Sequence, residues 1–125
     1  MNIIPNEQAK VKFLRLFPQK NQSHISNIFL EAIRKGGKDT PGKVALYAKA
    51  RVIVGIHEAR EYNDEHNANK FKLLSDMLTE HLETALEYAT YCLEWEALPR
   101  SQKDKIKGEK AAFYRKAWYE RGGGA

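Results

Sequence analysis

The sequence predicts an all-α protein, a compact bundle of about five helices built on a long antiparallel helical hairpin. Apolar residues recur at three- and four-residue intervals in several segments, helix start and stop signals separate these segments, and strand-like alternation is lacking. The 125 residues suit one domain. We therefore expect a single helical domain over residues 1–125, with residues 120–125 as a frayed tail.

Two short helices are predicted first. Asn6 can cap a helix over about 7–17, which Pro18 discourages from continuing. Ser23 can cap a second helix, which ends at the paired glycines 36 and 37. Its apolar stripe has the spacing of a helix that buries one face, with Ile25, Ile28, Phe29, Ala32 and Ile33.

The hairpin is predicted from two longer helices. Thr40 followed by Pro41 starts a helix over about 41–62, which is apolar almost all round, so we expect it to be the buried central element. The polar stretch YNDEHNANK suits a turn before a helix over about 68–98 with one apolar and one acidic face. The alternative is a continuous helix through this stretch, which would favour an elongated dimer.

The last helix is predicted over about 102–121. Pro99 ends the preceding helix, and Ser101 with Asp104 three residues later resembles a capping box. This helix is rich in lysine.

Charge is unevenly distributed along the chain, whose net charge is +5 at pH 7. Residues 1–60 carry +7, residues 61–99 carry −7 and residues 100–125 carry +5. Two basic segments around an acidic one suit a polyanionic partner or an acidic protein surface. The same distribution also fits internal neutralisation between neighbouring helices.

Several classes of function lack support. No apolar run approaches the roughly 18 residues of a membrane span, and the single cysteine, Cys92, fits a cytoplasmic protein without disulfides. His57 and Glu61 have a spacing that could share a metal, but His66 lies past the expected helix end, so no metal or other cofactor is expected. Because no nucleophile stands near a suitable base, we expect neither enzymatic activity nor a small-molecule substrate.

The stretch RKGGKDTPGKV, residues 34–44, approaches the pattern of a nucleotide-binding loop. A helix precedes it where such a loop needs a strand, and Val44 replaces the Ser or Thr that would bind magnesium. The stretch is better explained as one helix end and the next helix start. A phosphate contact is still an option, because a helix N-terminus lies beside Lys35, Lys38 and Lys43.

The stretch NQSHISNIF, residues 21–29, resembles the recognition helix of helix-turn-helix DNA-binding domains, with short polar residues in its first turn. It departs from the motif upstream, where Arg15 replaces a small residue and Gln19 replaces a glycine. The resemblance implies contacts with base edges or phosphates by Gln22, Ser23, His24 and Asn27. The alternative is a capped amphipathic helix with a polar start.

The last predicted helix interleaves cations with aromatic rings. At about 100° per residue, one face holds Lys103, Lys107, Lys110, Tyr114 and Arg121, with Trp118 at its edge. Cations neutralise phosphates and rings stack on unpaired bases, so this face suits nucleic acid. A stripe of Ile106, Phe113 and Ala117 suits docking on the bundle. Alternatively, the rings pack on the core and the lysines pair with the acidic helix.

The helix over 68–98 offers surfaces for a protein partner. Its acidic face, suited to a basic partner, consists of Asp76, Glu80, Glu83, Glu87 and Glu94. A second strip, the aromatic ridge, consists of Tyr88, Tyr91 and Trp95. Other helices should cover this ridge in a monomer, whereas an exposed ridge implies a partner or self-association.

We therefore expect a small, basic, helical nucleic-acid-binding protein, such as an accessory subunit of a nucleoprotein complex. It would bind DNA or RNA mainly through phosphate contacts. The alternative is a protein–protein interaction module, such as an adaptor, inhibitor or oligomeric scaffold, that uses the acidic face or the aromatic ridge.

Overall fold

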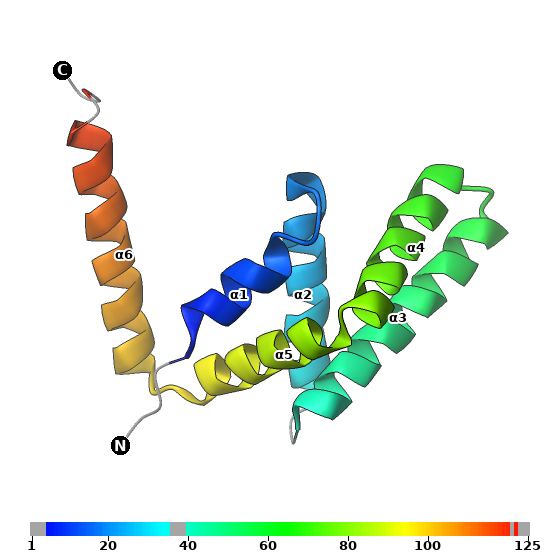
Figure 1. The fold of residues 1–125 in the computed structure, drawn as a ribbon, viewed down its shortest axis with the longest axis horizontal. Helices are drawn as coiled ribbons and strands as arrows, with labels where there is room; N and C mark the ends of the chain where they lie inside the picture. Colours follow the sequence, from blue (N-terminus) through cyan, green and yellow to red (C-terminus); the bar gives the residue numbers. More distant parts are fainter. Residues whose placement is uncertain (1–4, 36–39, 121, 123–125) are drawn as a thin grey trace. The chain divides into compact units, whose positions relative to one another are not determined.

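The computed structural model describes residues 5–35, 40–120 and 122. The described residues form six helices and no strands, which confirms the all-α class (Figure 1). The helices are α1 (Glu7–Leu14), α2 (Gln19–Lys35), α3 (Pro41–Glu61), α4 (Glu65–Glu80), α5 (Leu82–Ala97) and α6 (Arg100–Glu120). By its contacts the chain divides into a unit of residues 4–96, which holds α1 to α5, and a second unit that contains α6.

The expected antiparallel hairpin is formed by α3 and α4, which lie side by side (Figure 1). Thr40 caps α3 as predicted, because its hydroxyl oxygen accepts a hydrogen bond from the Lys43 amide at 3.2 Å. Pro41 occupies the first turn, where its missing N–H costs no hydrogen bond. The start of the hairpin is therefore encoded locally.

The turn of the hairpin is shorter than the polar stretch suggested. Asn63 adopts a φ of 54°, a left-handed conformation that asparagine tolerates better than most residues. Asp64 then caps α4 by accepting a hydrogen bond from the Asn67 amide at 3.1 Å. The alternative of one continuous helix through this stretch is therefore wrong, and α4 begins before the expected residue 68.

The helix expected over 68–98 is divided into α4 and α5 at His81, whose φ and ψ are −119° and 46°. The Thr79 hydroxyl donates a hydrogen bond to the Ser75 carbonyl at 3.0 Å, a back-bond that often bends helices. The chain changes direction between α4 and α5 (Figure 1). This bend is the reason that six helices form where five were expected.

The two N-terminal helices differ from the predicted ones in their bounds. Asn6 caps α1 as predicted, because its Oδ1 accepts a hydrogen bond at 3.0 Å from the amide two residues later. α1 ends at Leu14, short of residue 17, and α2 begins at Gln19, directly after Pro18. Ser23 therefore lies inside α2, and its predicted role as a cap is wrong.

Aromatic rings from α1, α2 and α5 occupy the centre of the core. Phe13 stacks on Tyr88 with ring centroids 4.6 Å apart, and Phe29 meets these two rings at 5.2 and 5.0 Å. The aliphatic side chains around them include Ile25, Ile28, Val44, Val52 and Leu74. Burial of these apolar groups holds α1 to α5 together.

α3 is not the buried central element that its composition predicts. One face is buried through Val44, Ala48 and Val52. The opposite face is exposed at Ile53 and at Leu46, whose exposed fraction is 70%. The expectation was wrong because the other helices of this unit cover α3 on one side only.

α6 begins at Arg100, directly after Pro99. The main-chain amides of Gln102 and Lys103 donate hydrogen bonds to the Pro99 carbonyl at 3.0 and 3.1 Å. Ser101 therefore lies in the first turn, and the predicted capping box is wrong. No described side chain of α6 is buried.

Candidate nucleic-acid and partner surfaces

The predicted cationic and aromatic face lies on α6, a continuous helix of 21 residues. Four of its residues recur at three- and four-residue spacing and therefore share one side of the helix: Lys103, Lys107, Lys110 and Tyr114. Trp118 lies at the edge of this side, and the rings of Tyr114 and Trp118 are both exposed. Arg121, the remaining predicted residue, lies outside the described residues.

Phe113 was predicted to belong to a stripe that docks on the bundle. In the structure, it adds a third ring to the surface of α6. Its exposed fraction is 67%. The expectation that it docks on the bundle stays a prediction. It meets Tyr114 edge-on, with ring centroids 5.6 Å apart. Three exposed rings therefore stand among the cations of α6.

Ion pairs along α6 support the helix locally. Arg100 and Asp104 approach to 4.0 Å, and Lys116 and Glu120 approach to 3.9 Å. Each pair spans four residues, the spacing at which opposite charges stabilise a helix by about 0.3–0.5 kcal/mol.

The polar residues near the start of α2 that were predicted to contact nucleic acid do not all face the same way. Gln22, Ser23 and Asn27 line a shallow hollow of about 280 Å³. His24 points elsewhere, because its ring meets the Phe71 ring of α4 at 5.1 Å. Only the first three residues thus share one place on the surface.

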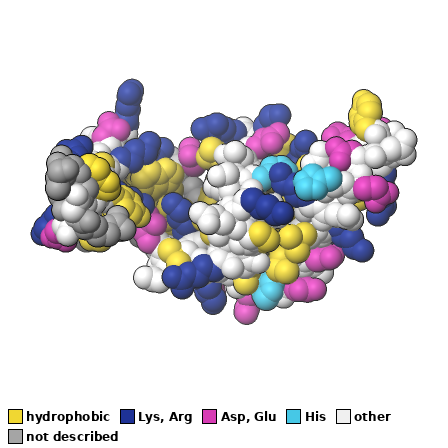
Figure 2. Space-filling view, turned by 90° about the horizontal axis from the view of Figure 1, so that it is seen from above, with side chains coloured by type: hydrophobic (Ala, Val, Ile, Leu, Met, Phe, Trp, Pro, Cys, Tyr) yellow, Lys and Arg dark blue, Asp and Glu magenta, His cyan; other side chains and the backbone are white. Residues whose placement is uncertain are grey.

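The environment of His24 is cationic. Burial lowers the pKa of His24, and the positive charges of Lys70 and Arg51 lower it further. On the face seen in Figure 2, histidine side chains lie directly beside Lys and Arg side chains. The positive groups that act on His24 of α2 therefore come from α3 and α4, and this arrangement was not predicted.

The lysines proposed for a phosphate contact before α3 have different surroundings. Lys35 pairs with Glu31 at 3.1 Å, and this hydrogen bond raises the pKa of Lys35. The Lys43 amide donates its hydrogen bond to Thr40. Lys38 lies outside the described residues. A joint site of these lysines therefore stays a prediction.

The predicted acidic face is not a continuous row. Asp76 and Glu80 belong to α4, whereas the bend at His81 places the other acids on α5, namely Glu83, Glu87 and Glu94. Glu87 approaches Lys12 of α1 to 3.8 Å. Internal neutralisation, the alternative reading of the charge distribution, therefore occurs at this position.

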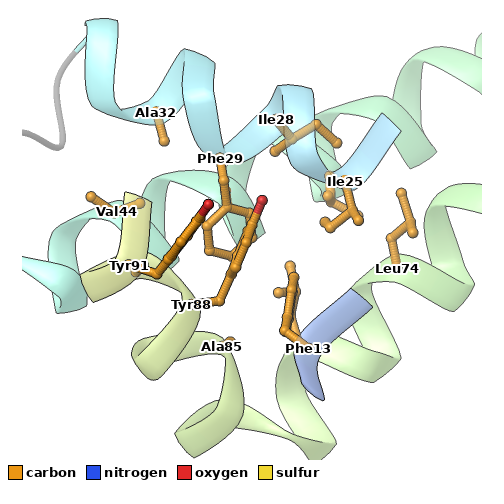
Figure 3. Close-up of a cluster of buried hydrophobic side chains, with 14 of the residues drawn as sticks. Phe13, Ile25, Ile28, Phe29, Ala32, Val44, Leu74, Ala85, Tyr88 and Tyr91 are labelled. Atoms are coloured by element: carbon orange, nitrogen blue, oxygen red, sulfur yellow. The ribbon is translucent and has the colours of Figure 1, made fainter. Parts of the chain in front are cut away.

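Two rings of the aromatic ridge belong to the core, as Figure 3 shows. The Tyr88 hydroxyl donates a hydrogen bond to Ser26 Oγ at 3.1 Å, and the Tyr91 hydroxyl donates one to Glu7 Oε1 at 3.2 Å. Trp95 is half-buried. The ridge is covered at Tyr88 and Tyr91, so these residues do not form a partner-binding surface.

An exposed apolar strip on α3 is the surface that the sequence analysis missed. It consists of Leu46, Ala50, Ile53 and Val54, which recur at helical spacing on the side away from the core. The signal was visible as a helix that is apolar almost all round. A helix that is apolar almost all round has two apolar faces. The core formed by α1 to α5 covers only one face of α3.

Three further observations concern metal binding, membrane insertion and the cysteine thiol. Among the described residues, no group of three or more His, Cys, Asp or Glu side chains lies close enough to hold a metal ion. Within the same residues, no helix has both the length and the apolar character needed to span a bilayer. Burial raises the pKa of the Cys92 thiol to about 11, so the thiol is a weak nucleophile at neutral pH.

Comparisons with protein-family models, with curated proteins and with solved structures give no match to this chain. The surfaces of the chain itself are therefore the basis for a function. The cations and exposed rings of α6 and the apolar strip of α3 are features that a stable core does not require.

Proposed function

We propose that this protein binds nucleic acid, either DNA or RNA, through α6. The observation that carries the proposal is the set of side chains on this one helix: seven Lys or Arg against three acids, interleaved with three exposed rings. Exposed rings beside cations suit a nucleic-acid surface, because rings stack on bases while cations neutralise phosphates.

Lys103, Lys107 and Lys110 are the cations proposed to contact phosphates, and Tyr114 and Trp118 are the rings proposed to contact bases or sugars. Phosphate contacts release counterions, so affinity should fall steeply with salt. Rings stack on unpaired bases with little sequence preference, which favours single strands over duplexes. The hollow beside Gln22, Ser23 and Asn27 is a secondary contact in this proposal.

The test is fluorescence anisotropy with labelled single-stranded DNA, single-stranded RNA and duplex DNA over a salt series. Lys103→Glu, Lys107→Glu and Lys110→Glu together should abolish binding at moderate salt. The matched control is Lys49→Glu, Arg60→Glu and Lys72→Glu, which makes the same charge change on α3 and α4. It should retain most of the affinity.

A second variant separates stacking from charge. Trp118→Ala should weaken single-strand binding about tenfold and leave the salt dependence unchanged, because the loss of one stacked ring removes no phosphate contact. The proposal fails if no nucleic acid binds at low salt, or if the triple Glu variant on α6 binds as well as the wild type.

The second candidate function is that of an oligomeric scaffold, favoured by the apolar strip of α3. A second copy of this chain fits the strip, because an antiparallel pair of α3 helices is self-complementary. Lys43 and Glu61 lie at opposite ends of the same face, about five helical turns apart, so each Lys43 would approach the partner copy's acid. Ala50, near the middle, permits close approach of the two backbones.

Light scattering over a concentration series tests this second candidate. The wild type should shift toward the mass of a dimer as its concentration rises. Leu46→Glu with Ile53→Glu should stay monomeric, whereas Val11→Glu, which alters an exposed aliphatic residue of α1, should dimerise like the wild type. A wild type that is monomeric at every concentration would contradict the candidate.

A further inference from the structure

A cavity of about 390 Å³ opens between the start of α2 and the first turns of α4. Its polar lining comes from Lys20 and Asn21 of α2 and from His66, Asn69 and Lys70 of α4. None of these five residues belongs to the nucleic-acid face of α6. The cavity therefore offers a site that is separate from the proposed function.

Asn21 is the buried polar residue of this site. Its exposed fraction is 3%, and it is the one buried polar or charged residue of the described chain. Its main-chain amide donates a hydrogen bond to the Pro18 carbonyl at 2.8 Å. Its side chain, which lines the cavity, has no hydrogen-bond partner among the described residues.

The residue is buried as a whole, and its side-chain amide is open to the cavity, where a ligand can reach it. The side-chain amide of Asn21 presents two N–H donors, so a ligand rich in acceptor oxygens satisfies it best. Asn69 brings a second amide to the same lining.

The charge of the cavity lining favours an anionic ligand. Lys20 and Lys70 are both present, and the described lining includes no Asp or Glu. The start of α2 lies at the same place, and a helix N-terminus of a 17-residue helix adds partial positive charge. Burial is the main cause that lowers the pKa of the nearby His24, and the positive charges of Lys70 and Arg51 lower it further. The described lining of the cavity therefore carries positive charge.

The volume of the cavity and its apolar lining favour an anion that carries an organic group. Cavities of about 300–1,000 Å³ are typical of small-molecule sites, and an inorganic phosphate would fill only part of this one. Pro18 and Leu73 complete the lining with apolar surface. Such surface suits a sugar or a ring attached to the anion.

We propose that the cavity between α2 and α4 binds a small organic phosphate monoester. The phosphate lies between Lys20 and Lys70, with the Asn21 amide donating to one of its oxygens. The organic part rests against Pro18 and Leu73. Two lysines with amide donors match a phosphate better than a carboxylate, because a phosphate has more acceptor oxygens and a higher charge at neutral pH.

The test is a nuclear magnetic resonance titration of the isotope-labelled full chain. The probes are ribose 5-phosphate, adenosine 5′-monophosphate, inorganic phosphate, and adenosine as the ligand without phosphate. Both monoesters should shift the side-chain amide signals of Asn21 and Asn69 in a saturable way and bind more tightly than inorganic phosphate. Adenosine should leave these signals in place.

Two variants assign the binding to the cavity. Lys20→Gln with Lys70→Gln should weaken monoester binding at least tenfold. Lys72→Gln removes an exposed lysine of α4 that does not line the cavity, so it should bind like the wild type. Because α6 is unchanged in both, their binding to single-stranded DNA reports on the proposed function separately.

The proposal is overturned if the Asn21 amide signals do not move with either monoester. Equal binding of adenosine and its monophosphate would also overturn it, because recognition would then not involve the phosphate. A double Gln variant that binds as tightly as the wild type would show that the phosphate is held elsewhere.

Discussion

The backbone of Gly55 in α3 lies against the ring of Phe71 in α4, so close that an added Cβ would stand 2.7 Å from the ring. The same ring meets the His24 ring of α2 edge-on, with centroids 5.1 Å apart. Phe71 is therefore held between the backbone of one helix and a side chain of another. Three helices meet at this ring.

The contact predicts the effect of adding one methyl group to α3. Gly55→Ala should lower the free energy of unfolding by about 1 kcal/mol, because the strain of overpacking, about 1–3 kcal/mol, exceeds the gain in helix propensity. Chemical denaturation followed by circular dichroism measures this change. Adding Phe71→Leu to the same chain should recover part of the loss.

Gly108→Ala is the matched control, because nothing lies within 4 Å of a Cβ built at Gly108 in α6. Alanine there should raise the helix content of α6, in keeping with a propensity gain of about 1 kcal/mol. If Gly55→Ala proved as stable as the wild type, the close approach of α3 to Phe71 would be wrong.

Much of the fold could be predicted from local signals. Asn6 and Thr40 cap their helices through contacts within three residues, and Pro41 sets the first turn of α3. The antiparallel hairpin followed from a polar stretch between two apolar patterns. Signals of this kind depend on neighbouring residues alone, so the sequence displays them directly.

The features that the sequence did not reveal depend on distant residues. The bend at His81 involves no glycine or proline, and it lets α5 bring Tyr88 onto Phe13 while α4 stays on α3. The exposed strip of α3 looks like core in the sequence, because a run of apolar residues reads the same whether its side chains are buried or exposed. The cavity beside Asn21 likewise required the start of α2 and α4 to meet in space.

The hydrogen bond between Tyr88 and Ser26 should contribute measurably to stability. Tyr88→Phe removes the hydroxyl and keeps the ring stacked on Phe13, so the free energy of unfolding should fall by about 0.5–1.5 kcal/mol. Tyr88→Ala should cost about 3–5 kcal/mol, because it also removes the buried ring. Urea denaturation compares the two variants.

Ser26→Ala completes a double-mutant cycle for this hydrogen bond. The cost of Tyr88→Phe should shrink when Ser26 is already alanine, since the partner is gone. Strict additivity of the two substitutions would mean that the hydroxyls do not interact.

The lowered pKa of His24 predicts a specific pH dependence of stability. Its ordinary value is 6.5, and the folded state lowers it through burial and through the charges of Lys70 and Arg51. Below pH 6.5 the unfolded chain takes up a proton that the folded chain resists. The free energy of unfolding should therefore be fully retained above pH 6.5 and fall as the pH drops toward the folded-state pKa.

Denaturation curves between pH 5 and 7 test this dependence, above the range in which ordinary carboxylates titrate. His24→Gln should flatten the curve, because the side chain no longer titrates. Lys70→Gln should reduce its slope by removing one source of repulsion. A wild-type curve that is flat across this range would contradict the assignment.

Cys92 should resist alkylation in the folded protein. Burial is the main cause that raises its pKa from the ordinary 9.0 to about 11, with Glu96 adding to the shift and the hydrogen bond with Tyr88 opposing it. At pH 8 the thiolate, which is the reacting form, should be about a hundredfold scarcer in the folded chain than in the unfolded chain. Mass spectrometry after iodoacetamide treatment with and without urea measures the ratio of rates. The folded rate should rise with pH beyond the point at which an ordinary thiol levels off, and equal rates at pH 8 would mean that the thiol is neither buried nor shifted.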